Sequence, residues 1–389
     1  MAAAGCLRPG VRAAGLVWPS HRAGGGTRLA RVVVSGYYGF GNAGDEVILA
    51  VLLRALNGHE VTVLSHAPEV TRAEHGVRAE HRASPPGVLR ALARCDLLVS
   101  GGGGLLQDAT GPASVPYYLG IVMLARALGK PVMVYAQGIG PLGAGWARRS
   151  LRLLRGAAAI TVRDAESAEW LRAAGVPPAR IEVTADAALA LPPPRRTAEA
   201  NPPPELAALG VRRGERAVAL APRPYGDGRF AAKLAAVADA LQDRLGARAV
   251  LVPMQLPEDV AACERIAAAM RRPAPVLRQR PVPARYAEVF AGFDLVVGMR
   301  LHALILATLA RAAPVGLSYD PKIDAFLEGL GTPRFGLPLD AEEGAVVSVA
   351  LDAASADPDA LAARVSRLRE AALRNNAILL DLLAWPPRR

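Results

Sequence analysis

Residues 31–53 read RVVVSGYYGFGNAGDEVILAVLL and predict a strand, a glycine-bearing loop and a helix in that order. The β-branched run at 32–34 is typical of a strand. After the loop, the apolar series that begins at Val47 falls on one face of a helix. Because the strand is continuously apolar instead of alternating, it is expected inside a parallel sheet that is covered on both faces.

The same order of strand, loop and helix repeats along the chain. Further strands are expected at 61–64, 97–100, 132–136, 160–162 and 181–183, and then at 217–221, 249–253, 295–298 and 315–318. Helical patterns lie between them, for example at 118–128 and 230–245. The alternation predicts an α/β protein with two doubly wound, Rossmann-like domains. In such a tandem, binding loops follow the carboxyl ends of the strands and face a shared cleft.

Two proline runs, at 192–194 and 202–204, mark the expected boundary between the domains. Neither run can lie inside a helix or a central strand. We therefore expect an N-terminal domain over 31–191, a linker over 192–216 and a C-terminal domain over 217–385. The last helix of the chain is a candidate to pack back on the N-terminal domain.

The chain has 389 residues, with 46 Lys and Arg against 35 Asp and Glu, and its net charge is +11. This balance raises the question of nucleic-acid or membrane binding. Aromatic residues make up only 5% and do not alternate with the basic ones, so no nucleic-acid partner is expected. Residues 1–30 contain four arginines and no acid. We expect them to form a disordered arm, and a membrane-touching arm is the functional alternative.

Metal and disulfide chemistry are not expected. The three cysteines form no CxxC pair, and no apolar stretch reaches the roughly 20 residues of a membrane span. We expect a cytoplasmic protein without a metal or cofactor. The pairs His59/His66 and His75/His81 have spacings that suit no metal site, so these side chains are expected in solvent.

The loop GFGNAG at 39–44 matches the GxGxxG pattern of dinucleotide sites formally. A ribose-binding acid should then end the second strand, but that strand ends in Ser65 and His66. Asp45 would also repel a pyrophosphate. Asn42 and Asp45 suit a sugar or a phosphate better, although Asp45 as a simple helix N-cap is the alternative.

Two further loops after strands in the first half carry amide side chains. They are GGGGLLQD at 101–108, with Gln107, and QGIGP at 137–141, with Gln137. Glycine removes the side chain, so a ligand or a neighbouring part of the chain can approach closely. We expect both loops to border the cleft.

Cations follow several strands. Arg223 stands between two prolines after a strand, Arg300 and His302 open a helix, and Lys322 follows another strand. A helix N-terminus disfavours cations unless an anion shares the site, so Arg300 and His302 indicate an anionic ligand. A structural role is the alternative for His302. In the first half, Arg163 is a similar candidate unless it only pairs with the aspartate that follows it.

Four motifs together resemble the polysaccharide pyruvyl transferase family, and in particular its CsaB type. They are GYYGFGNAGDE at 36–46, GGGGLLQD at 101–108, AQGIGPL at 136–142 and GMRLHALILA at 298–307. The resemblance implies a GT-B-like fold and transfer of the pyruvyl group of phosphoenolpyruvate to a sugar as a cyclic ketal. For the CsaB type, it implies a lipid-linked, N-acetylmannosamine-containing precursor of a cell-wall polymer, whose ketal S-layer proteins recognise.

The resemblance also assigns roles to residues. Arg300, Leu301 and His302 would bind phosphoenolpyruvate, Arg223 lies where another donor-binding arginine is expected, and Lys322 is a weaker candidate. We expect His302 to transfer the proton, with Arg300 stabilising charge and Asp45 as the alternative base. The acceptor candidates lie in the first half: Gly39, Asn42, Gly44, Gly103, Gln107 and Gln137.

Two rival functions stay open at this point. A nucleotide-sugar glycosyltransferase shares the two-domain architecture, and a non-catalytic sugar-binding protein would need only the acceptor side. For the pyruvyl transferase, the remaining basic surface could contact the inner membrane leaflet peripherally and help the enzyme meet a lipid-linked acceptor.

Overall fold

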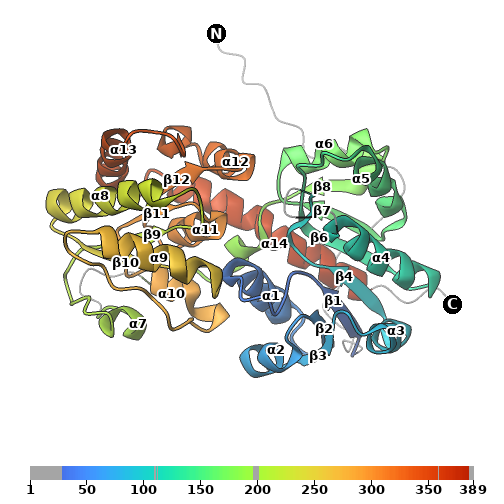
Figure 1. Cartoon of the computed structure of the whole chain (residues 1–389). Helices are drawn as coiled ribbons and strands as arrows, with labels where there is room; N and C mark the ends of the chain where they lie inside the picture. Colours follow the sequence, from blue (N-terminus) through green and yellow to red (C-terminus); the bar gives the residue numbers. More distant parts are fainter. Residues whose placement is uncertain (1–28, 109–110, 112, 196–200, 358, 385–389) are drawn as a thin grey trace, which may run out of the picture.

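The computed structural model describes residues 29–108, 111, 113–195, 201–357 and 359–384. Residues 1–28 of the expected basic arm lie outside the described part. The chain forms two parallel sheets, one in each half, with helices packed against them (Figure 1). The predicted α/β fold class with two Rossmann-like units is confirmed.

The first sheet has the strand order β3-β2-β1-β4-β6-β7-β8, and β5 pairs with β6 beyond this path. Its strands are β1 (Arg31–Ser35), β2 (Glu60–Ser65), β3 (Arg78–His81), β4 (Leu97–Ser100), β5 (Gly103–Leu106), β6 (Val132–Ile139), β7 (Ala159–Val162) and β8 (Ile181–Val183). The strand order reverses between β1 and β4, whose last residues Ser35 and Ser100 are paired. In doubly wound sheets, this switch point is where ligands bind.

The second sheet has the order β10-β9-β11-β12-β13. Its strands are β9 (Ala217–Ala221), β10 (Arg248–Leu251), β11 (Leu295–Gly298), β12 (Ala313–Ser318) and β13 (Gly336–Pro338). The switch point lies between β9 and β11, where Ala221 pairs with Gly298. Arg223 and Arg300 lie two residues after Ala221 and Gly298, respectively.

Helices cover the sheets in three packed cores. One core joins the first sheet to α3 (Pro85–Arg94), α4 (Ser114–Ala127), α5 (Gly145–Ser150), η1 (Leu151–Gly156) and α6 (Ala165–Ala173). A second, shared by both halves, contains α1 (Ala43–Ala55), η3 (Ala187–Ala190), α10 (Tyr286–Phe290), α11 (Leu301–Leu309) and α14 (Ala362–Ala384). The third joins the second sheet to α8 (Gly228–Leu245), α9 (Glu258–Ala269) and α13 (Glu343–Ser355). The remaining helical segments are α2 (Pro68–His75), η2 (Pro178–Arg180), α7 (Pro204–Ala207), η4 (Pro283–Arg285), α12 (Pro321–Leu330) and η5 (Pro333–Phe335).

The last helix, α14, leaves the second half and packs on the first. Tyr135 of β6 donates a hydrogen bond from Oη to Oδ1 of Asn376 at 2.6 Å. Asn375, which is fully buried, accepts from Thr184 Oγ1 at 2.8 Å and donates to the carbonyl oxygen of Ala185. A buried amide with both ends satisfied fixes the position of the helix on the first sheet.

Two segments differ from the expected pattern. The stretch expected as a linker contains the short helix α7, and its Leu206 is fully buried in the shared core. The run of four glycines is only partly a loop, because Gly103 and Gly104 begin β5. At Gly101, the group that approaches closely is the protein's own Tyr38 ring, whose Oη would lie 2.2 Å from a Cβ.

Candidate active site

The first glycine loop is joined to the second half by backbone hydrogen bonds. Ala43 N donates to the carbonyl oxygen of Met254 at 2.7 Å, and Leu256 N donates to that of Gly41 at 3.0 Å. Gly41 has φ +77°, and a Cβ there would lie 2.5 Å from the oxygen of Leu256. Only glycine fits both the backbone conformation and the close approach. The loop after β1 is therefore held against the loop that follows β10, the strand next to the second switch point.

Asn42, not Asp45, is the N-cap of α1. Its Oδ1 accepts from the backbone N–H groups of Gly44 at 3.0 Å and Asp45 at 3.2 Å, and its Nδ2 donates to Gln255 Oε1 at 2.8 Å. The alternative interpretation of Asp45 as the cap is thus corrected. Asn42 holds the start of α1 and, through Gln255, the contact between the two halves, which we call the junction. Asp45 is therefore available for another role.

Asp45 is buried beside the second glycine loop. It is 7% exposed, and a Cβ on Gly103 would lie 2.6 Å from its Oδ1, so Gly103 makes room for this carboxylate. Burial raises the pKa of Asp45 to about 7, the charge of His302 opposes the rise, and Glu46 adds to it. A carboxyl group with this pKa can both hold and release a proton near neutral pH.

His302 lies across the junction from Asp45, in the first turn of α11. Its imidazole covers Gly44, where a Cβ would be 1.9 Å from Nδ1. On the other side, His302 Nε2 is 3.7 Å from Asp186 Oδ2. The N-termini of α1 and α11 thus meet at this ring, and helix N-termini favour bound anions.

Asp186 is a buried carboxylate that the sequence did not point to. Its Oδ1 caps η3 by accepting from Ala188 N, and its Oδ2 lies 3.3 Å from Arg163 Nη1. Burial alone would raise the pKa of Asp186, but His302 and Arg163 hold it below the ordinary range. At 3.7 Å, Asp186 faces the His302 ring as an ion-pair partner and not as a hydrogen-bond acceptor. Arg163 also pairs with Asp164, so the expected ion pair exists together with this second one.

Arg300 is held by a carboxylate within the second half. Its Nε and one Nη atom lie 3.0 Å and 2.5 Å from the two oxygens of Asp259, which is fully buried. Asp259 also accepts from the backbone N–H groups of Met254 and Gln255. A guanidinium has five N–H donors, so this contact orients Arg300 and leaves its other donors for a ligand.

Arg223 and Lys322 meet at one aromatic ring. The centroid of Tyr319 is 4.2 Å from Arg223 Cζ and 5.4 Å from Lys322 Nζ, and Lys322 also pairs with Asp320 at 2.8 Å. Together with Arg300, these residues form what we call the cationic edge of the second sheet. Three cations that follow neighbouring strands favour a ligand with more than one negative charge.

The other candidates have mainly structural contacts. Gly39 has φ +78° and donates to Glu46 Oε1, and Gln137 is fully buried, with Nε2 donating to the carbonyl oxygen of Gly103 at 2.6 Å. Leu301 belongs to the shared core and is 6% exposed. Gln107 is half-buried. These residues shape the loops around Asp45 and His302.

An aromatic cluster lies on the first half. Phe40 stacks between Tyr37 and His66, with ring centroids 4.1 Å and 4.3 Å away. Arg82 lies 3.8 Å from the ring centroid of Tyr117 and 5.0 Å from that of Phe40, and it forms no ion pair with a described residue. The cluster follows β1, β2 and β3 at the same edge as Asp45. Nothing in the spacing of these residues signals that the fold brings them together.

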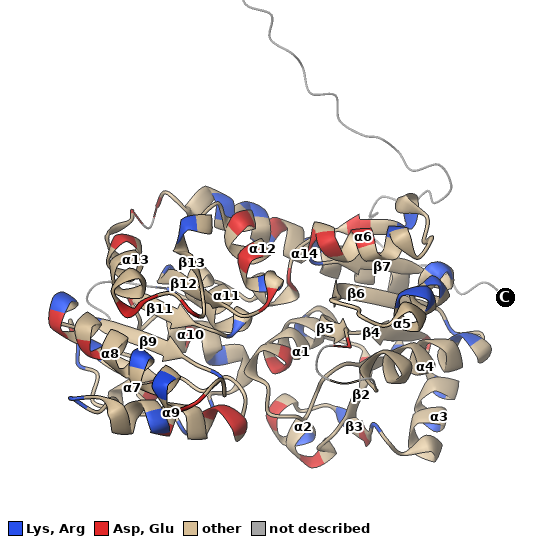
Figure 2. Cartoon of the chain, turned by 45° about the horizontal axis from the view of Figure 1, so that its top comes forward, with Lys and Arg blue, Asp and Glu red and all other residues tan. Residues whose placement is uncertain are grey.

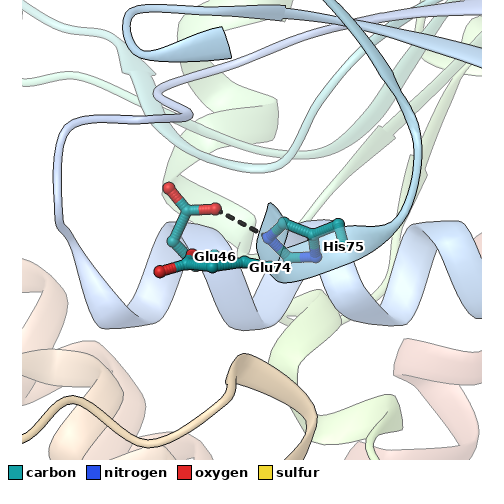
Figure 3. A group of neighbouring side chains, drawn as sticks. All are labelled: Glu46, Glu74 and His75. Atoms are coloured by element: carbon teal, nitrogen blue, oxygen red, sulfur yellow. Dashed lines mark hydrogen bonds and ion pairs between the residues drawn. The ribbon is translucent and has the colours of Figure 1, made fainter. Parts of the chain in front are cut away.

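One expectation about the histidines was wrong. The side chain of His75 is 3% exposed and not in solvent, and its Nε2 lies 3.0 Å from Glu46 Oε2 (Figure 3). Glu74 completes a group of three potential metal ligands, but it pairs with Arg280 of the second half. Glu46 also accepts a hydrogen bond from Gly39, so each of the two carboxylates in this group already has partners within the protein. We interpret it as a structural link across the junction.

Two facing Rossmann-like units with their switch points in contact define a GT-B-type fold. Solved structures agree at the level of fold alone. A putative UDP-N-acetylglucosamine 2-epimerase from Listeria monocytogenes has a TM-score of 0.63 at 14% identity, covering 93% of this chain and 98% of its own. HepE from Anabaena, in complex with UDP and glucose, has a TM-score of 0.58 at 14% identity, covering 92% and 100%. A glycosyltransferase from Rickettsia africae has a TM-score of 0.58 at 11% identity, covering 92% and 100%.

Sequence comparison then narrows the class. The family profile described as polysaccharide pyruvyl transferase matches residues 42–321, which include Asp45, Arg300 and His302. No curated protein matches the chain in sequence. The chain belongs to the polysaccharide pyruvyl transferase family and is therefore a transferase enzyme.

Proposed function

We propose that this enzyme transfers the pyruvyl group of phosphoenolpyruvate to two hydroxyls of a sugar and releases phosphate. The observation that carries the proposal is the contact between the two switch points, which sets Asp45 and His302 beside the cationic edge. The second half would then bind the donor and the first half the acceptor.

The donor fits the cationic edge by charge. Phosphoenolpyruvate carries a carboxylate and a phosphate, and Arg223, Arg300 and Lys322 offer the two kinds of cation that bind such groups. The anchoring of Arg300 by Asp259 orients the guanidinium before the ligand arrives. The same cations would stabilise the charge that leaves with phosphate.

The chemistry needs one group that gives a proton and one that takes it. A sugar hydroxyl adds to C2 of the enol and loses its proton, and C3 gains a proton and becomes a methyl group. A second hydroxyl then displaces phosphate at C2, and its proton leaves with the phosphate. His302, oriented by Asp186, would protonate C3. Asp45, with a pKa of about 7, would accept the proton of the attacking hydroxyl.

The acceptor would lie on the first half, between Asp45 and the aromatic cluster. Rings of Tyr37 and His66 suit the apolar faces of sugars, and Arg82 suits a phosphate of an activated acceptor. By the resemblance to the CsaB type, the acceptor would be a lipid-linked saccharide with N-acetylmannosamine, and the ketal would serve S-layer anchoring. None of the described helices is long and apolar enough to span a bilayer.

One assay separates this function from its rival. Phosphate release from phosphoenolpyruvate should require a lipid-linked N-acetylmannosamine acceptor, and phosphoenolpyruvate should raise the melting temperature. Because HepE was crystallised with UDP and glucose, a nucleotide-sugar glycosyltransferase is the alternative. Stabilisation by a UDP-sugar, with no phosphate release from phosphoenolpyruvate, would favour that alternative.

A further inference from the structure

Four neighbouring helical segments of the first half contain no acidic residue. These are α3, α4, α5 and η1, with the sequences PPGVLRALAR, SVPYYLGIVMLARA, GWARRS and LRLLRG. They carry seven arginines, all exposed: Arg90, Arg94, Arg126, Arg148, Arg149, Arg152 and Arg155. Figure 2 accordingly shows blue and no red on α3, α4 and α5.

The seven arginines share one side of the molecule. All four segments bury their apolar residues in the same core, against the same face of the first sheet. In addition, α3 packs on α4, and α4 packs on η1. Their outward sides therefore form one continuous surface, which we call the arginine face.

These arginines have no acidic partners in the described part of the chain. Arg126, Arg148 and Arg155 donate to backbone carbonyl oxygens. No ion pair is formed by any of the seven, whereas Arg271 and Arg272 on the second half both pair with Asp243. The four segments therefore carry seven positive charges and no negative one, and among the seven Arg148 has a carboxylate nearby, because its charge helps to lower the pKa of Asp108.

Large apolar side chains stand among these arginines in solvent. Leu89 on α3, Met123 on α4 and Trp146 on α5 are 46%, 39% and 49% exposed. An apolar side chain next to a cation is stabilised at the boundary between lipid headgroups and acyl chains, because its apolar surface leaves water there. Tryptophan is typical of that boundary. Aliphatic side chains such as Leu89 and Met123 add nothing to binding of nucleic-acid phosphates. The combination therefore favours a lipid surface over a nucleic acid.

The face also lies in the right place for a lipid-linked substrate. The helices α4 and α5 follow β5 and β6, so both begin at the sheet edge that carries Asp45. The loop before Trp146 is held at this edge, because Asp108 accepts from the backbone N–H groups of Gly143 and Ala144. Contact at Trp146 would bring the bilayer next to the acceptor side of the junction.

We propose that the arginine face docks on an anionic lipid bilayer and presents the first half to a membrane-bound acceptor. The role in presenting an acceptor rests on the proposed function, whereas the docking itself does not. The interaction is peripheral and depends on charge, so it weakens as the salt concentration rises.

The test is co-sedimentation of the full chain with phosphatidylcholine vesicles that contain either no or 30% phosphatidylglycerol. A variant with R90Q, R94Q, R149Q and R152Q removes four exposed arginines that form no hydrogen bond or ion pair with a described side chain. The matched control carries R213Q, R216Q, R244Q and R367Q, four exposed arginines elsewhere. We expect binding to anionic vesicles only, at least a tenfold weaker partition for the first variant, and an unchanged partition for the control.

Three outcomes would overturn the proposal. They are equal loss in both variants, loss only when residues 2–28 are deleted, or binding of single-stranded RNA by the arginine face without vesicle binding. Phosphate release with the lipid-linked N-acetylmannosamine acceptor, dispersed in detergent without vesicles, is measured in parallel and should be the same in the wild type and both variants. If the wild type releases no phosphate, the proposed function fails, while the vesicle result still decides the docking.

Discussion

His302 occupies the space that a side chain on Gly44 would fill. A Cβ on Gly44 would lie 1.9 Å from Nδ1 of the ring. The glycine at the start of α1 therefore sets the position of an imidazole that belongs to the other half of the molecule. This relationship makes the contact between the halves part of the site.

Replacing Gly44 tests that relationship. In Gly44→Ala the methyl group would displace the His302 ring from its position between Gly44 and Asp186, so we expect kcat to fall by 100-fold or more with little change in the affinity for phosphoenolpyruvate. Gly104→Ala is the matched control, because a Cβ there meets nothing within 4 Å. Equal activity of the two variants would show that His302 needs no fixed position.

Two substitutions test His302 and the carboxylate behind it. His302→Ala should abolish turnover while binding of phosphoenolpyruvate, followed by thermal shift, survives. Asp186→Asn should lower kcat about 10-fold or more by removing the negative charge that orients the ring. Asp164→Asn, at the other carboxylate that contacts Arg163, is the control and should stay active. A misfolded His302→Ala protein would instead indicate a structural histidine.

The raised pKa of Asp45 predicts how stability depends on pH. Burial raises its pKa from 3.8 in the unfolded chain to about 7, so between these values the folded protein holds a proton that the unfolded chain has released. Stability from this group is fully present below pH 4 and is lost as the pH rises to 7, by up to about 1.4 kcal/mol per pH unit.

The variant Asp45→Asn has no ionisable carboxyl group at this position, so this contribution to the pH dependence is removed. Urea unfolding between pH 5 and pH 8 should therefore show that the free energy of unfolding of the variant increases relative to that of the wild type as the pH rises. The difference should become constant above pH 7. Asp243→Asn serves as a control, because hydrogen bonding to Arg271 lowers the pKa of this exposed carboxyl. A pH-independent difference between Asp45→Asn and the wild type would contradict the raised pKa.

The two donor-side arginines should respond differently to removal. Arg300→Ala leaves Asp259 buried without its cation, and removing one partner of a buried ion pair costs about 3–5 kcal/mol. Arg223 rests on the ring of Tyr319 and has no carboxylate partner among the described residues. Arg223→Ala should therefore keep most of its stability and raise the KM for phosphoenolpyruvate about 10-fold or more. Denaturant unfolding and steady-state kinetics on both variants separate these effects.

Arg82 tests the aromatic cluster as part of the acceptor side. Arg82→Ala should raise the KM for the acceptor about 10-fold and leave the KM for phosphoenolpyruvate unchanged. Arg72→Ala, in the same half but paired with Glu69, is the comparison. An equal rise in both KM values for Arg82→Ala would assign Arg82 to the general shape of the junction.

The sequence predicted the fold well because buried parallel strands are written as continuous apolar runs. It also selected Arg300 and His302, since cations at a helix start conflict with a local rule. It could not supply Asp259 or Asp186, which lie far from them along the chain and come close only when the sheets assemble. The error on His75 has the same origin. His75 is buried by contact with Glu46, which lies on the helix α1 and not in the segment around His75.

The position of α14 has a consequence for synthesis of the protein. Tyr135 and Thr184 of the first half bind Asn375 and Asn376, which are translated about 190 residues or more later. While the ribosome is still making the second half, the face of the first sheet that α14 packs on is covered only by α1 and η3, and the hydroxyls of Tyr135 and Thr184 lack these amide partners. The nascent first half is therefore completed only when α14 has been synthesised, and until then we expect it to be a substrate for chaperones.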